Sequence, residues 1–183
     1  MELFRSLRIR AGSNILRKKS LKVKRKRDFV NLKKAARIGI VWDIIKNDDL
    51  AAISDFILKM NERGIKVDII GFFHGKQLPD NLTALRYITC LKREDLSFLY
   101  RPKTVEADRF INSAFDILIE ISFRDCLPVR YLSTLTPARC RVCCDTGDDQ
   151  NRNFADIMIS TGKNRDVREY LNQVVTYLEI INN

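Results

Sequence analysis

Short apolar runs alternate with helical patterns along the chain from residue 36 onwards. The runs ARIGIVWD (36–43) and KVDIIGFF (66–73) have the composition of buried strands. Between them, four apolar residues share one face of a predicted helix: Ile53, Phe56, Ile57 and Met60. Gly64 follows as a stop signal. This order predicts two parallel strands joined by a helix with a right-handed crossover.

The second half of the chain repeats this rhythm. Four more strands are predicted: residues 86–91, 116–122, 138–144 and 155–161. Helices are predicted after Thr104, from about Asp125 to Pro137, and from Val167 to Ile181. Residues 36–183 are therefore predicted to form one Rossmann-like α/β domain, a three-layer sandwich with a mostly parallel sheet of about six strands. The connections 73–85 and 145–154 lack a helix pattern, so one pair of neighbouring strands could be antiparallel.

Residues 1–35 form a separate, basic segment, which we call the arm. The chain has 33 Lys and Arg against 23 Asp and Glu, and residues 1–34 hold 13 of the basic residues and two of the acidic ones. Leu3, Leu7, Ala11 and Ile15 would line one face of a helix. Eight cations then follow within eleven residues: Arg17, Lys18, Lys19, Lys22, Lys24, Arg25, Lys26 and Arg27. Their mutual repulsion predicts an arm that is helical or partly disordered when it is alone.

The concentrated charge of the arm predicts a polyanionic partner that binds these eight cations. RNA or a ribonucleoprotein is the partner that we expect first, because phosphates would relieve the repulsion and release counterions. An anionic membrane surface is the alternative, with Leu3, Phe4, Leu7 and Ile15 entering the headgroup region. A third reading has the apolar stripe packing on the α/β body. Only Phe4 and Phe29 are aromatic in the arm, so base stacking is not indicated.

The segment PARCRVCCDTG contains three of the five cysteines. Cys140 and Cys143 have metal-knuckle spacing, but alternation along a strand would point them to opposite faces. We therefore predict buried structural thiols and no metal site. Arg5, Arg8 and Arg10 stand where a secretion signal would have its apolar centre. A reducing, cytoplasmic location is therefore expected. The alternative is a cytoplasmic protein attached to the surface of the inner membrane. No disulfide-linked partner is expected.

A crevice site is the remaining candidate for chemistry. Asp43, His74, Ser122 and Asp145 each follow a predicted strand, and ligands of open parallel sheets bind at the carboxyl ends of the strands. Arg124 falls in the same region. The first βα turn, WDIIKNDD, lacks the glycine pattern of a dinucleotide site, and STGKNRD lacks a P-loop frame. The sequence therefore favours a binding protein without a cofactor over an enzyme.

Glu120 is a special position inside the predicted strand 116–122. If both faces of the sheet are covered, Glu120 is a buried carboxylate with a perturbed pKa; if the helix layer ends there, it faces water. The sequence leaves the two open.

Three strings carry a resemblance: NLKKAARIGIVWD, LKREDLSFLYRPK and FDILIEISFRDCLPVRYLSTLTPARCRVCCD. With them, nearly the whole chain resembles a family of small bacterial proteins with a charged N-terminal helix and no established activity. FDILIEIS and ARCRV are also similar to the N-terminal half of lipopolysaccharide heptosyltransferases, which implies a Rossmann-like fold and a link to envelope synthesis or a nucleotide sugar. Cys143 stands where both patterns tend to have Gly, and the second Rossmann half that binds the sugar nucleotide is missing from the sequence.

Overall fold

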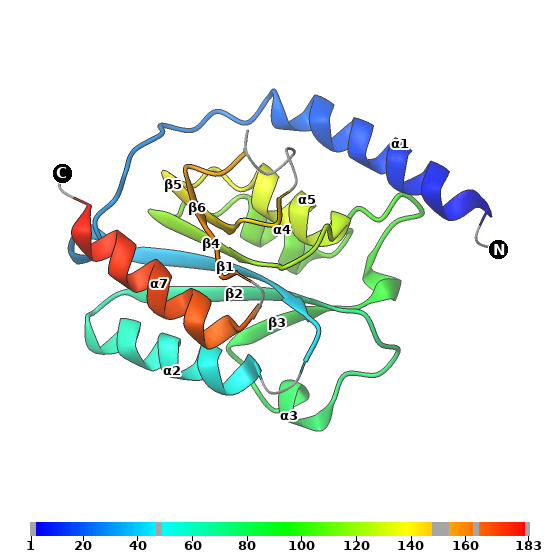
Figure 1. Ribbon diagram of the computed structural model, residues 1–183. Helices are drawn as coiled ribbons and strands as arrows, with labels where there is room; N and C mark the ends of the chain where they lie inside the picture. Colours follow the sequence, from blue (N-terminus) through cyan, green and yellow to red (C-terminus); the bar gives the residue numbers. More distant parts are fainter. Residues whose placement is uncertain (1–2, 47–48, 148–153, 163–164, 182–183) are drawn as a thin grey trace.

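The computed structural model describes residues 3–46, 49–147, 154–162 and 165–181 (Figure 1). Six strands form one sheet: β1 (Arg37–Ile44), β2 (Lys66–Phe73), β3 (Ile88–Leu91), β4 (Ile117–Ile121), β5 (Cys140–Cys144) and β6 (Ile157–Ile159). The α-helices are α1 (Leu3–Ser20), α2 (Asp49–Glu62), α3 (Asp80–Thr83), α4 (Val105–Ile111), α5 (Leu127–Leu135) and α7 (Val167–Ile180). Two 3-10 turns, η1 (Leu32–Lys34) and η2 (Arg93–Asp95), complete the described elements.

The strand order is β3-β2-β1-β4-β5-β6, and all five neighbouring pairs are parallel. The predicted Rossmann-like α/β fold is confirmed. The antiparallel pair that the short connections allowed is not present, because even the connection containing the four-residue α3 returns the chain to the same end of the sheet. The chain leaves β1 toward β2 on one side and later crosses to β4 on the other, so the order reverses between β1 and β4.

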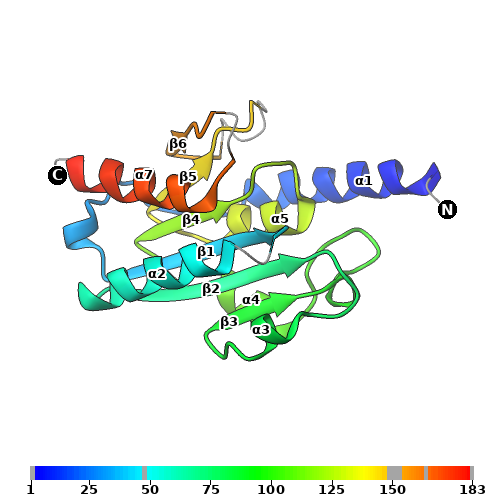
Figure 2. The same ribbon diagram turned by 60° about the horizontal axis from the view of Figure 1, so that its bottom comes forward.

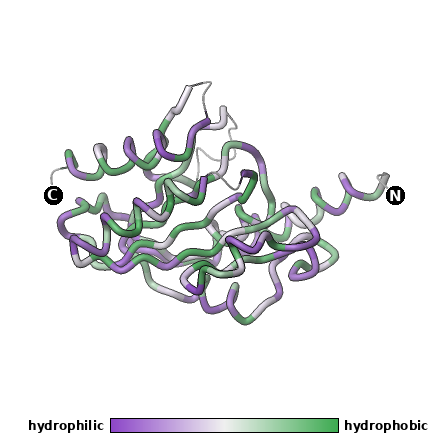
Figure 3. The backbone as a smooth tube through the Cα atoms, turned by 90° about the horizontal axis from the view of Figure 1, so that it is seen from below, coloured by the Kyte–Doolittle hydropathy of each residue, from purple (hydrophilic) through white to green (hydrophobic). Residues whose placement is uncertain are grey.

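Helices cover both faces of the sheet (Figures 1 and 2). On one face, α2 and α7 pack on a core that includes Ile40, Trp42 and Tyr170. On the other face, α4 and α5 pack on a second core that includes Val41 and Phe110. Neighbouring residues of β1 enter opposite cores because side chains alternate along a strand. Figure 3 accordingly shows mostly hydrophobic colour along the central strands.

The arm packs on the α/β body. Helix α1 lies against α5, with Leu16 buried beside Leu127 and Tyr131. The Tyr131 hydroxyl donates to the Gly12 carbonyl at 3.2 Å, and Arg8 Nε donates to the Phe98 carbonyl at 2.7 Å. Residues 21–31, which we call the strap, then run across the same side of the molecule as α1 (Figure 1).

The predicted apolar stripe of α1 is not the side that meets the body. Phe4 and Leu7 are 67% and 60% exposed, and Ile15 is also exposed, whereas the docked side consists of Gly12, Leu16 and their neighbours. In Figure 3, α1 alternates between hydrophobic and hydrophilic turns. Among the described residues, no helix is both long and apolar enough to cross a bilayer.

Candidate functional site

A polar cluster occupies the carboxyl ends of β1, β2 and β4. It consists of Asp43 near the end of β1, His74 directly after β2, and Arg124 and Cys126 in the loop between β4 and α5. We call these four residues the strand-end cluster. The cluster lies where the strand order reverses, which is the place where open α/β sheets bind ligands.

The Asp43 carboxylate is the centre of the cluster, and its side chain has no exposed surface. His74 Nε2 lies 2.5 Å from Asp43 Oδ1, and Arg124 Nε donates to Asp43 Oδ2 at 2.8 Å. Burial acts to raise the pKa of Asp43, but the hydrogen bonds from His74 and Arg124 outweigh it and hold the pKa below 3.8. Asp43 is therefore an anion in a buried position.

His74 Nε2 is also approached by two other side chains. An Arg124 terminal nitrogen lies 2.7 Å from it, and Cys126 Sγ lies 4.0 Å from it. Burial, together with the charge of Asp43, raises the pKa of the Cys126 thiol far above its usual value of 9.0. The Cys126 thiol is therefore protonated at neutral pH.

The structure brings two of the four predicted crevice residues into contact and places Asp145 elsewhere. Asp43 and His74 are in direct contact, and the buried Ser122 hydroxyl donates to the Arg124 carbonyl at 2.8 Å, which supports the loop after β4. Asp145 follows β5 and accepts from the Gly147 N–H at 2.9 Å. Asp145 lines a hollow of about 260 Å³, with Phe123, Thr161 and Arg165 among its walls.

Cys126 is the cluster member that sequence reasoning missed. Only the cysteines of β5 have a spacing that suggests chemistry, whereas Cys126, like Cys90, stands alone in the sequence. The available signal was its position two residues after Arg124, in the loop that follows a strand at the predicted ligand end of the sheet.

The cysteines of β5 are buried free thiols. Cys140 and Cys144 face the core shared with Val142, in agreement with strand alternation. Burial raises the pKa of the Cys140 thiol to about 11 and that of the Cys144 thiol to about 12. These thiols fill space in the core and are not prepared for nucleophilic or redox chemistry.

Glu120 is buried in the middle of β4, so the first of its two sequence readings is the correct one. The Ser133 hydroxyl donates to its carboxylate. Burial nevertheless raises the pKa of Glu120 above the usual 4.5, and the hydrogen bond from Ser133 offsets only part of that effect.

Glu120→Gln should stabilise the protein at pH 8 and leave its stability unchanged at pH 4. A carboxyl group whose pKa is raised in the folded state contributes stability below its unfolded pKa and loses it as pH rises through the folded pKa. Thermal unfolding of wild type and variant at the two pH values measures the difference. Glu62→Gln, at the exposed end of α2, is the control; equal pH profiles for wild type and Glu120→Gln would contradict the assignment.

The predicted polyanion-binding cations fall into two groups. Arg25 is buried against the body: it makes a two-pronged ion pair with Asp156 at 2.6 and 2.8 Å, and the two side chains are 6% and 9% exposed. Arg27 reaches the same carboxylate at 3.6 Å from a more exposed position. Arg25 thus anchors the strap and is not available to an external polyanion.

The second group remains on the surface. Five cations have exposed side chains and no ion pair with any carboxylate in the described part of the chain: Arg17, Lys18, Lys22, Lys24 and Lys26. Lys19, in the last turn of α1, is half-buried, and burial lowers its pKa. The surface cations follow one another along the end of α1 and the strap, so they form one basic band.

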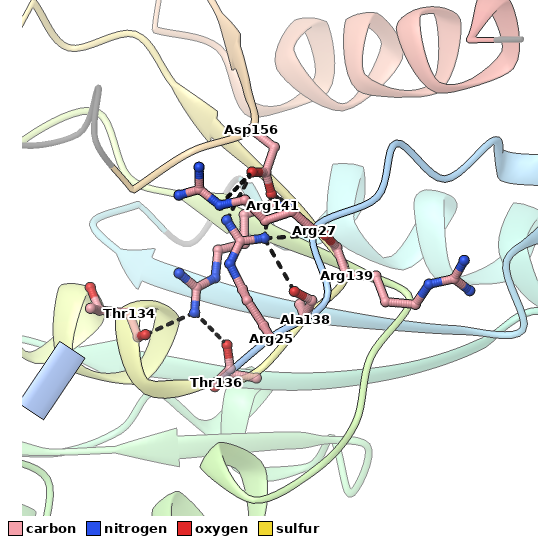
Figure 4. A network of polar contacts seen from close by, with 8 residues as sticks. All are labelled: Arg25, Arg27, Thr134, Thr136, Ala138, Arg139, Arg141 and Asp156. Atoms are coloured by element: carbon pink, nitrogen blue, oxygen red, sulfur yellow. Dashed lines mark hydrogen bonds and ion pairs between the residues drawn. The ribbon is translucent and has the colours of Figure 1, made fainter. Parts of the chain in front are cut away.

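A cavity of about 750 Å³ lies between the arm and the body. Its walls include five arginines: Arg17, Arg25, Arg27, Arg130 and Arg141. Figure 4 shows Arg25 and Arg27 directed at Asp156, and Arg141 directed at the carbonyls of Thr134 and Thr136. Burial and the charge of Arg25 lower the pKa of Arg141 to about 10. The cavity therefore has an excess of positive charge that an anionic group would relieve.

The fold, the strand order and the strand-end cluster define the chain as a Rossmann-like α/β protein with a docked basic arm. Residues 8–181 match the model of a family described as "Family of unknown function (DUF6913)". The chain belongs to this family. No curated protein matches the chain.

Proposed function

We propose that the protein docks on an anionic membrane surface through the outward side of α1 and the strap. The observation that supports this most directly is that one side of the molecule combines exposed apolar side chains with the basic band. Phe4 and Leu7, in the first turns of α1, are 67% and 60% exposed, and Leu21 is 85% exposed among the five cations without ion pairs. Exposed apolar side chains on a basic segment favour adsorption to an anionic membrane, because partial insertion then adds to the charge attraction.

The apolar side chains distinguish a membrane from RNA as the partner. RNA would use the cations of the basic band but would leave Phe4, Leu7 and Leu21 in water. In a membrane, those side chains enter the acyl boundary while the cations meet lipid phosphates. The cytoplasmic leaflet carries anionic lipid and is the surface that we propose.

The expected energies agree with reversible docking. Five cations at about 1 kcal/mol each give about 5 kcal/mol, which is less than the about 8 kcal/mol of a micromolar complex. Burying an apolar side chain contributes up to about 1.5–3 kcal/mol, so two or three partly inserted side chains supply the difference. The cavity lined by arginines adds positive potential on the same side of the body.

Sedimentation with phosphatidylcholine vesicles, with and without phosphatidylglycerol, tests the proposal on the full-length chain. Binding should require the anionic lipid and weaken with salt. Changing Lys18, Lys22, Lys24 and Lys26 together to Gln should lower the affinity by between about tenfold and 1000-fold, at up to about 1 kcal/mol per cation. The matched control changes four exposed lysines elsewhere to Gln: Lys59, Lys66, Lys76 and Lys103.

RNA is the second candidate, because the same five cations also suit a phosphate backbone. Leu7→Ser combined with Leu21→Ser separates the two partners. The pair of changes should weaken vesicle binding and leave RNA binding unchanged, since it removes no charge. Salt-sensitive RNA binding without vesicle binding by the wild type would overturn the membrane proposal in favour of RNA.

A further inference from the structure

We propose that Asp43, His74 and Cys126 bind a divalent transition-metal ion, and that Zn²⁺ is the ion that this donor set fits best. Their donor atoms, one oxygen, one nitrogen and one sulfur, all lie within 4.8 Å of one another. The three side chains come from the end of β1, from the residue after β2 and from the β4–α5 loop, which the parallel sheet brings to one edge. The inference does not depend on the membrane proposal, because the strand-end cluster shares no residue with the arm.

The side chains of Asp43, Arg124 and Cys126 converge on His74 Nε2, which cannot form a hydrogen bond with all three. His74 Nε2 lies 2.5 Å from Asp43 Oδ1 and 2.7 Å from an Arg124 terminal nitrogen. A carboxylate only accepts and a guanidinium only donates, whereas one imidazole nitrogen carries either a proton or a lone pair. A metal ion among the three donors would use the lone pairs of the nitrogen, the carboxylate and the thiolate together.

The same convergence argues against a nucleophilic triad. In a Cys-His-Asp relay, the imidazole faces the nucleophile with one nitrogen and the carboxylate with the other. Here His74 Nε2 is the atom nearest both to Asp43 and to Cys126. Donors directed at a common point are the arrangement of a coordination site.

The distances require only small movements to suit zinc. Zn–N, Zn–O and Zn–S bonds of about 2.0–2.3 Å place tetrahedral ligand atoms about 3.3–3.6 Å apart. The 2.5 Å between His74 and Asp43 would open, and the 4.0 Å between His74 and Cys126 would close, each by less than about 1 Å. Mg²⁺ and Ca²⁺ prefer all-oxygen sites, so the nitrogen and sulfur donors disfavour them.

The surroundings would hold the ligands and leave one position open. Arg124 Nε donates to Asp43 Oδ2 at 2.8 Å, and a terminal nitrogen of Arg124 reaches Oδ1 at 3.5 Å. The shorter bond fixes the carboxylate with Oδ1 toward His74, as second-shell partners do in metal sites. The Arg124 side chain is 45% exposed and can turn its terminal nitrogen away from the imidazole. Cys126 stands at the N-cap of α5. A bound metal ion would displace the proton of its thiol, because metal binding is coupled to deprotonation of the ligand. His74 is 42% exposed, so water can reach a fourth coordination position.

Titration of the full-length protein with Zn²⁺ and with Co²⁺ tests the site. One equivalent of Zn²⁺ should raise the Tm, and Co²⁺ should produce a thiolate-to-cobalt charge-transfer band. Cys126→Ser should remove that band, and His74→Gln should lower Zn²⁺ affinity by more than the about 10–100-fold typical of second-shell changes. Cys90→Ser, which changes the half-buried thiol on β3, is the matched control and should keep both signals.

Several results would overturn the inference. Wild-type protein that binds neither ion stoichiometrically, or a charge-transfer band that survives Cys126→Ser, would exclude this site. Loss of the band in Cys90→Ser would locate the thiolate ligand elsewhere. Because the His74 side chain is 42% exposed, His74→Gln should fold normally, and it gives a test even if Cys126→Ser is unstable. Vesicle binding by His74→Gln should equal that of the wild type, so failure of this inference and failure of the membrane proposal can be told apart.

Discussion

Asp156→Asn is expected to lower the free energy of unfolding by about 3–5 kcal/mol, the range for removing one partner of a buried ion pair. The change keeps the size of the side chain and its acceptor for the Arg141 backbone N–H, which lies 2.9 Å away. It removes the negative charge next to Arg25, whose side chain is 6% exposed. Arg25 would then be a buried cation without a counter-charge, close to Arg27 and Arg141.

Chemical denaturation of the full-length protein at pH 7 measures this loss. Asp68→Asn is the matched control, because it breaks the Arg37–Asp68 pair of 2.7 Å, whose side chains are about one-third exposed. Exposed pairs contribute about 0–1 kcal/mol, so the control should change little. Equal losses in the two variants would show that burial does not set the strength of the Asp156 pair.

The stability from Asp156 should also disappear in acid. Burial acts to raise its pKa, but hydrogen bonds from Arg25 and the Arg141 backbone outweigh it and lower the pKa below 3.8. A group with a lowered folded pKa contributes stability above its unfolded pKa and loses it as pH falls through the folded pKa. The difference between wild type and Asp156→Asn should therefore shrink as the pH falls below about 4.

The sheet could be predicted because its elements have strong local signals. Buried runs such as 66–73 and 116–122, separated by helical spacing, leave few arrangements other than a parallel sheet. The direction of β3 could not be predicted from its short connection to β2. That direction depends on where a four-residue helix and its flanking loops return the chain, and no periodic pattern encodes this.

The strand-end cluster was only partly predictable. The rule for ligand positions in parallel sheets identified Asp43 and His74, which are in contact. It also identified Asp145, but β4 lies between β1 and β5 in the sheet. At about 4.8 Å per strand, Asp145 begins about two strand spacings away from Asp43. Cys126 required the conformation of the β4–α5 loop, which follows from tertiary contacts such as that between Ser122 and Arg124.

The side of α1 that packs on the body could not be predicted from the apolar pattern, for a different reason. Leu3, Leu7, Ala11 and Ile15 form a regular stripe, and an apolar stripe ordinarily faces the core. In the structure, close approach at Gly12 and burial of Leu16 fix the opposite side of the helix against α5. A single glycine in a helix gives no periodic signal, so periodicity could find the stripe without finding its direction.

Gly12→Ala should therefore destabilise the docking of α1, although alanine is a better helix former than glycine by about 1 kcal/mol. A Cβ atom at residue 12 would lie 2.5 Å from the Leu99 carbonyl oxygen, a backbone atom, and 3.0 Å from Leu127 Cδ2. Such overpacking costs about 1–3 kcal/mol, and a shift of α1 would also expose Leu16.

Thermal unfolding and limited proteolysis of the arm measure the effect of Gly12→Ala. Asn14→Ala, on the exposed side of the same helix, is the matched control and should be neutral or slightly stabilising. A Gly12→Ala protein as stable and as protease-resistant as Asn14→Ala would mean that α1 does not dock at Gly12. Gly12→Ala keeps every cation and every exposed apolar side chain of the arm. Vesicle affinity measured beside Tm therefore shows whether membrane docking needs α1 held on the body, or only the residues that α1 carries.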